Sequence, residues 1–292
     1  MKPAPCYHLC SEGTAEEILF KCSEDFIQGM NIVAIAVNNS HIRMLAFCLM
    51  SNHFHFVLQG EDVQINSFLE TIHRCLYTRL GKVKDIDKKF FSSLKWHRHR
   101  ITDRDYFKTA IAYVLNNPLK AGLEFRAEDY QWSSAMLYFM PAWLHRMLEA
   151  SWTAVADMTK RHLREILHSK SVLKDDWMIT DEGYVWPGSY VDFKIVELKF
   201  KTSDEFYKCL RYLKNNEYVK EMTLNKRVCI PDTELRAYIK FLAEEYYHVR
   251  SLRALTPAQR KQIAEMIERD LHCGEKQLFR LLGLTNIDVE QV

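Results

Sequence analysis

Hydrophobic positions in the first 60 residues change their spacing several times, and each change predicts a different element. Residues 6–11 form a short apolar segment typical of a strand. Apolar positions in residues 14–29 recur at helical spacing, namely Ala15, Ile18, Leu19, Cys22 and Phe26. Residues 42–50 and 53–59 are apolar runs separated only by Ser51 and Asn52, which predicts a β-hairpin.

The following 60 residues predict three more elements. Residues 63–80 return to helical spacing, residues 90–102 contain a candidate edge strand, and residues 103–117 are helical again. Asp103 or Asp105 can cap the last helix at its start, and Pro118 is expected to end it. The order is strand, helix, strand, strand, helix, strand, helix. It favours an α+β fold, a ferredoxin-like antiparallel sheet with helices, followed by a mostly helical C-terminal region.

The second half of the chain is mainly helical by pattern. Residues 143–169 are mostly helical, residues 181–190 form a turn or linker candidate, and helices resume from residue 203. Thr256 and Gln259 form a capping box with Pro257 at the first helical position. Gly274 then interrupts the chain before a short helix over 275–282, so this segment is either a helix-turn-helix or a plain helical hairpin.

Length and composition indicate an ordered protein of more than one module. The 292 residues include 48% hydrophobic residues but only 9 Gly and 7 Pro. We expect a domain over 1–140, a helical and irregular connection over 141–205, and a helical C-terminal module over 206–292. The eight cysteines contain no Cys-x-x-Cys pair, which argues against a zinc knuckle or a disulfide scaffold.

The charge distribution and the hydropathy of the chain limit the kinds of partner that we expect it to bind. The net charge is only +2, but basic residues cluster between residues 82 and 104, at Lys82, Lys84, Lys88, Lys89, Lys95, Arg98, Arg100 and Arg104. The N-terminus has no apolar signal core, and no stretch approaches the length of a membrane span. We therefore expect a soluble cytoplasmic protein without a membrane partner.

The strand predicted over 53–59 contains two histidines, His53 and His55, two positions apart. Side chains at this spacing share one face of a strand, so both imidazoles can present a nitrogen to one divalent ion. The alternative is that both rings lie on a solvent face without a metal. A second such pair, His97 and His99, alternates with Arg98 and Arg100, which would repel a cation, and we interpret that segment as basic and phosphate-facing.

A third ligand and a nucleophile can come from the helix predicted over 103–117. Tyr113 and Asn117 are four residues apart and share a face of that helix. If this face packs beside the histidine strand, Asn117 completes a metal site and Tyr113 stands one turn away. Ordinary packing and helix-end roles are the alternatives, and Tyr106 lies on the same helix. Mixed imidazole and oxygen ligands suit Mg²⁺, Mn²⁺ and several transition metals.

Three segments together resemble the HUH single-tyrosine transposases, in particular the REP-associated tyrosine transposases related to the insertion-sequence 200 group. These are residues 46–58 (AFCLMSNHFHFVL), 113–123 (YVLNNPLKAGL) and 128–134 (EDYQWSS). The resemblance implies that His53, His55 and Asn117 bind a divalent ion such as Mg²⁺ or Mn²⁺. It also implies that Tyr113 attacks single-stranded or hairpin DNA, giving a 5′-phosphotyrosine and a free 3′-hydroxyl.

One position and one segment of the chain depart from the pattern of this family. Ser51 stands where the family usually has Pro, and residues 90–100 replace a Gly-rich phrase. The expected function is a metal-dependent DNA transposase located in the cytoplasm with the nucleoid. The alternatives are a domesticated DNA-binding regulator without cleavage activity, and an HUH replication initiator or relaxase. The sequence leaves open whether the active unit is one chain or a homodimer.

Overall fold

The computed structural model describes residues 4–11, 19–81, 94–121, 123, 126–211, 232–249, 251–271 and 275–284. Its architecture is α+β, with a four-stranded antiparallel sheet and many helices. The fold class predicted from the sequence is confirmed at this level. No helix within those ranges is both long and apolar enough to cross a membrane.

The central sheet contains the strands predicted from the apolar runs. Its order is β2-β3-β1-β4, and every neighbouring pair is antiparallel. The strands are β1 (Cys6–Ser11), β2 (Arg43–Met50), β3 (His53–Gln59) and β4 (Trp96–Ile101). Ser51 and Asn52 form the tight turn between β2 and β3, so the predicted hairpin is confirmed. Residues 90–93, at the start of the predicted edge strand, lie outside the described residues.

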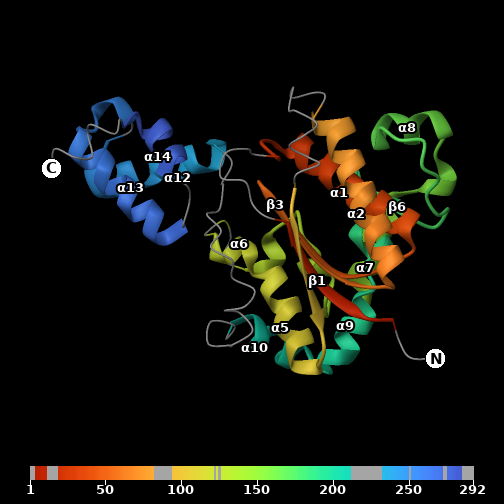
Figure 1. Ribbon diagram of the computed structural model, residues 1–292. Coiled ribbons are helices and arrows are strands. Elements are labelled where there is room, and N and C mark those ends of the chain that lie inside the picture. Colours follow the sequence, from red (N-terminus) through yellow and green to blue (C-terminus); the bar gives the residue numbers. More distant parts are fainter. Residues whose placement is uncertain are drawn as a thin grey trace.

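Successive side chains of each strand point to opposite faces of this sheet, and the two faces pack against different helices. Leu9, Phe54 and Phe56 join a buried core with α1 (Ser23–Ser40) and α2 (Asp62–Leu76), which is followed by a π-helical turn, Tyr77–Gly81. The opposite face packs against α5 (Arg104–Leu115). Figure 1 shows α1 and α2 on one side of the sheet and α5 on the other.

The first helix differs from the one predicted over 14–29. Residues 12–18 lie outside the described residues, and residues 19–22 are not helical. The backbone amides of Leu19 and Phe20 instead donate to the Ser51 carbonyl at 2.8 and 2.9 Å. Helix α1 starts at Ser23 and continues to Ser40. Its middle is buried on nearly all sides, so it has no polar face from which helical spacing could be recognised.

The start of α5 agrees with the sequence, and its end differs in detail. Asp103 caps the helix, since its side chain accepts from the Tyr106 amide at 2.8 Å. The helix ends at Leu115, and Pro118 then lies in the first turn of a short helix, α6 (Asn117–Lys120). Proline is tolerated there because the first turn needs no amide donor.

Residues 127–211 surround the sheet with short elements. These are η2 (Ala127–Asp129), η3 (Ala135–Leu137), α7 (Ala142–Ser151), β5 (Thr153–Ala154), η4 (Val155–Asp157), α8 (Lys160–Leu167), β6 (Met178–Ile179), η5 (Pro187–Ser189), α9 (Phe193–Phe200) and α10 (Ser203–Arg211). The mostly helical prediction over 143–169 agrees with α7 and α8, and the exception lies at residues 152–159, where β5 pairs with β6 and η4 follows. Helices resume at Phe193 rather than at 203, and α9 and α10 pack against α5.

The C-terminal helices have a core of their own. They are α12 (Asp232–Tyr247), η7 (Leu252–Ala254), α13 (Pro257–Leu271) and α14 (Glu275–Leu282), and they gather at one end of the molecule (Figure 1). The capping box is confirmed, because Thr256 and Gln259 exchange hydrogen bonds of 2.9 and 3.3 Å. Gly274 lies outside the described residues. The division of the chain at residues 140 and 205 stays a prediction. Apolar side chains between residues 155 and 206 contribute to the buried cores on both faces of the central sheet.

Candidate functional site

The sheet face beneath α5 is rich in histidine. His55 on β3 lies opposite Cys10 on β1, and His8 on β1 lies opposite His99 on β4. His53 is two residues before His55 and therefore shares its face. The His8 ring is 5.9 Å from the His55 ring and 6.0 Å from the His99 ring, centroid to centroid. Four imidazoles from three strands thus meet on one side of the sheet.

Tyr113 lies beside two of these rings, His55 and His8. Its ring centroid is 5.6 Å from the His55 centroid and 5.6 Å from the His8 centroid, with edge-on geometry in both cases. Tyr113 is 5% exposed and His55 is 1% exposed. Helix α5 holds the tyrosine in place because apolar side chains beside it, including Ala110 and Val114, pack into the core beneath. The structure therefore brings the predicted nucleophile and one predicted ligand together.

His53 is oriented by its neighbour in the hairpin turn. Its Nδ1 is 2.7 Å from the Asn52 side-chain oxygen, and both residues are buried. An amide oxygen only accepts, so this contact is a hydrogen bond when Nδ1 carries the proton. The Nε2 lone pair is then directed away from the turn, which is the state that metal ligation needs. The His53 ring lies 4.8 Å from the His55 ring.

Asn117 is buried one helical turn after Tyr113. Its side-chain nitrogen donates to the backbone carbonyl oxygens of Tyr113 at 2.8 Å and Val114 at 3.2 Å. The amide is thereby fixed to its own helix, and its oxygen is the atom that can coordinate a cation. The role of Asn117 as a third ligand stays a prediction.

Lys120 is a neighbour of Tyr113 that sequence reasoning did not single out. Its ammonium lies over the Tyr113 ring, 3.7 Å from the centroid, at the end of α6. Part of the lysine is exposed, but packing of the ammonium against the protein lowers the pKa of Lys120 to about 8. The group therefore carries a positive charge at neutral pH and loses it in mildly alkaline solution.

A second set of ligand atoms also lies on this face. His8, Cys10 and His55 are buried, and each offers a ligand atom within 4.8 Å of the others. Sequence reasoning missed His8 and Cys10. The available signal was their spacing of two on a predicted strand, the same spacing as His53 and His55.

Arg98 does not lie beside His97 and His99 as the sequence suggested. Alternation on β4 places Arg98 on the face opposite His99, so its charge is directed away from the histidines. The Arg98 guanidinium lies 3.9 Å from the centre of the Tyr7 ring and forms an ion pair with Asp62. The basic cluster from Lys82 to Lys89 lies outside the described residues.

The 128–134 segment supports the histidine strand from the outer edge of the sheet. The Leu49 amide donates to the Trp132 carbonyl at 2.9 Å, and the Ser134 amide donates to the Phe47 carbonyl at 3.0 Å. The Tyr130 hydroxyl donates to the Leu49 carbonyl at 2.8 Å. These bonds cover the open edge of β2, which pairs with β3 on its other side.

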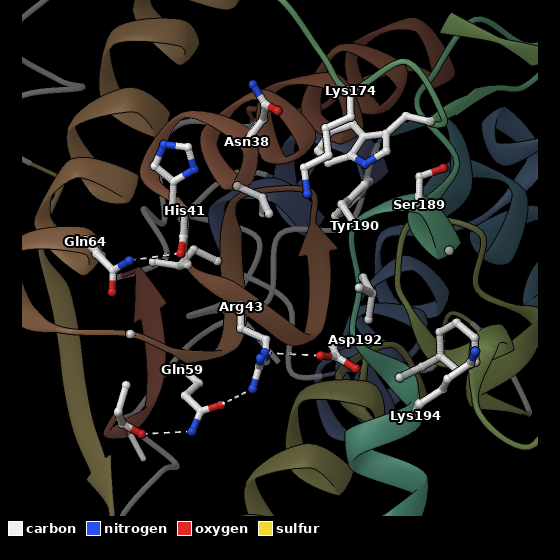
Figure 2. A pocket seen from close by; sticks show the side chains of 18 of the residues that line it. Asn38, His41, Arg43, Gln59, Gln64, Lys174, Ser189, Tyr190, Asp192 and Lys194 are labelled. Atoms are coloured by element: carbon white, nitrogen blue, oxygen red, sulfur yellow. Dashed lines mark hydrogen bonds and ion pairs between the residues drawn. The ribbon is translucent and has the colours of Figure 1, made fainter. Parts of the chain in front are cut away.

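A cavity of about 800 Å³ lies away from Tyr113. Figure 2 shows His41, Arg43, Gln59, Lys174, Tyr190 and Asp192 around it. Arg43 bridges Gln59 at 3.1 Å and Asp192 at 3.2 Å, so part of its charge is compensated within the wall. None of the residues predicted to act in catalysis or metal binding lines this cavity.

Comparisons with known proteins gave one structural similarity. No family model and no curated protein matches the chain. The structure of a REP-associated tyrosine transposase bound to a REP hairpin aligns with a TM-score of 0.38 and 12% identity. The alignment covers 47% of this chain and 79% of the other.

Proposed function

We propose that this chain is a metal-dependent DNA strand transferase, a transposase that cleaves and rejoins single-stranded or hairpin DNA. The observation that carries the proposal is the position of the Tyr113 ring beside His55 and His8, at 5.6 Å from each. The three sequence segments that resemble HUH single-tyrosine transposases supply the substrate class. A DNA substrate would place the protein in the cytoplasm with the nucleoid.

His53, His55 and Asn117 would hold the divalent ion, Mg²⁺ or Mn²⁺ by the resemblance. Buried imidazoles on a paired strand are suited to this task, because the hairpin fixes both rings and Asn52 orients His53. When bound, such an ion supplies positive charge against the charge that develops on the phosphate.

Tyr113 would exchange one phosphodiester for another. Its hydroxyl oxygen forms a bond to phosphorus while the bond from phosphorus to the 3′-oxygen breaks. The phenol gives up its proton, and the departing 3′-oxygen takes one up. The products are a 5′-phosphotyrosine and a free 3′-hydroxyl, and attack by a 3′-hydroxyl on the same phosphorus rejoins the strand.

Lys120 would favour the reactive form of Tyr113. A phenol has an ordinary pKa of about 10, so little phenolate exists at neutral pH. The Lys120 ammonium, 3.7 Å from the ring centre, stabilises negative charge on the ring and its oxygen. The lysine thus acts electrostatically on the nucleophile, and only while it is protonated.

The C-terminal helices support a second candidate, a DNA-binding regulator. Helices α13 and α14 pack on an apolar core of their own, and Thr256 caps α13, which suits either a helix-turn-helix or a plain helical hairpin. In the first proposal the same module helps to hold the target DNA. Duplex binding that is unchanged in His53→Ala, without any covalent product, would favour the regulator.

The test is covalent trapping on a labelled hairpin oligonucleotide with Mn²⁺, followed by denaturing electrophoresis. Wild-type protein is expected to form an adduct that disappears in Tyr113→Phe. Tyr106→Phe is the matched control, because Tyr106 is a buried tyrosine on the same helix. An adduct that survives Tyr113→Phe, or that is lost equally in Tyr106→Phe, would overturn the assignment of the nucleophile.

A further inference from the structure

We infer that His8, Cys10 and His55 form a binding site for a zinc-class transition-metal ion. All three residues are buried, and their ligand atoms lie within 4.8 Å of one another. The inference concerns metal binding by the sheet itself and does not rest on the DNA chemistry proposed above.

The backbone register explains why these three side chains meet. Cys10 lies opposite His55 across the β1–β3 pair, and His8 is two residues before Cys10 on the same face. The ligands therefore come from two directly paired strands in the middle of the sheet. Such a support is rigid, because both strands have hydrogen-bonded neighbours on each side.

The donor set selects the kind of ion. One thiolate and two imidazoles are the ligands that zinc and similar ions prefer, while Mg²⁺ and Mn²⁺ prefer oxygen. Tetrahedral zinc holds its ligand atoms roughly 3.5 Å apart, so ligand atoms that lie within 4.8 Å of one another need to close by at most about 1.3 Å.

The site would keep a position for a further ligand. Three protein ligands with one open position are typical of catalytic zinc, whereas structural zinc is held by four. Helix α5 covers this face, and the Tyr113 ring lies 5.6 Å from both His8 and His55. The fourth ligand position would therefore lie on the face of the sheet that α5 and Tyr113 cover.

This set shares His55 with the predicted set of His53, His55 and Asn117, so the two sets compete for one imidazole. Three variants separate them. Cys10→Ser removes the sulfur ligand, and His53→Gln affects only the predicted set. Cys48→Ser is the matched control, since Cys48 is a buried cysteine opposite His55 on the other neighbouring strand.

The experiment is titration of the full-length apoprotein with Zn²⁺ and Co²⁺. Wild type is expected to bind one equivalent and to show the near-ultraviolet absorption of a thiolate–cobalt bond. Cys10→Ser should lose this band and bind Zn²⁺ at least tenfold more weakly, while His53→Gln and Cys48→Ser should keep the band. A band that persists in Cys10→Ser, or that disappears in Cys48→Ser, would overturn the inference.

A measurement of the zinc ligands in the unmutated protein does not depend on whether the variants fold. X-ray absorption at the zinc edge is expected to show one sulfur at about 2.3 Å together with nitrogen ligands. A shell of nitrogen and oxygen alone would overturn the inference. Failure here would leave the Tyr113 adduct unaffected, and absence of that adduct would leave the metal titration unaffected.

Discussion

Lys120→Met tests whether the lysine over the nucleophile contributes to catalysis. The ammonium lies 3.7 Å from the centre of the Tyr113 ring, over which part of a phenolate charge is spread. Two opposite unit charges about 4 Å apart attract by about 1 kcal/mol in water and about 4 kcal/mol near a protein surface. Because Lys120 is partly exposed, the attraction is expected in the lower half of this range, about 1–2 kcal/mol. Loss of this stabilisation corresponds to a roughly 5- to 30-fold slower attack by Tyr113.

The assay is the rate at which the protein forms its first covalent adduct, measured with the hairpin oligonucleotide in excess over the protein. At pH 7, Lys120→Met should be slower than wild type by the factor above, and Lys120→Arg should retain much of the rate because it keeps the charge. The ratio of wild type to Lys120→Met should fall toward one as the pH rises past about 8, where Lys120 loses its proton.

Lys174→Met is the matched control for this prediction. Lys174 is also a lysine near an aromatic ring, 5.9 Å from the Trp177 centroid, but it lines the cavity that contains no predicted catalytic residue. Equal rates for wild type and Lys120→Met at pH 7 would refute the reasoning. So would a loss of the same size in Lys174→Met.

Three further predictions concern stability. Tyr138→Phe should lower the free energy of unfolding in denaturant by about 1–3 kcal/mol, because the buried Tyr138 hydroxyl donates to the Leu45 carbonyl at 2.6 Å; an unchanged midpoint would contradict this. Arg260→Met should destabilise the C-terminal helices selectively, because Arg260 donates to the Leu282 carbonyl at 2.9 Å and to two others. Hydrogen exchange should accelerate in α13 and α14 while β3 stays protected, and uniform acceleration would count against a separate module. Desolvation of the ammonium where it packs against the protein lowers the pKa of Lys120 to about 8 from 10.5, so the folded state disfavours its charged form. Relative to Lys120→Met, wild type should gain stability between pH 8 and 10.5, and a constant difference would exclude this cause.

Local sequence signals predicted local structure well. The β2–β3 hairpin, the Asp103 cap and the Thr256 capping box all follow from residues close together in the chain, and all three are confirmed. The first helix was predicted wrongly because its interior is buried around most of its circumference. A helix without a polar face has no 3.6-residue alternation to detect.

The candidate site was only partly predictable, because it depends on strand register. His53 and His55 are neighbours in the sequence, and their spacing was sufficient to place them on one face. His8 and Cys10 join them only through the antiparallel pairing of β1 with β3, which no local pattern encodes. Arg98 and His99 differ from this case, because alternation along β4 alone places them on opposite faces, and the predicted strand was sufficient to show it.

Peptide mapping of the protein–DNA adduct by mass spectrometry tests most directly whether Tyr113 is the nucleophile. We expect one modified residue, Tyr113, carrying a 5′-phosphorylated oligonucleotide, with much less adduct when the metal is removed or in His55→Ala. Modification of another residue, or an adduct whose yield is unaffected by metal removal and by His55→Ala, would contradict this expectation.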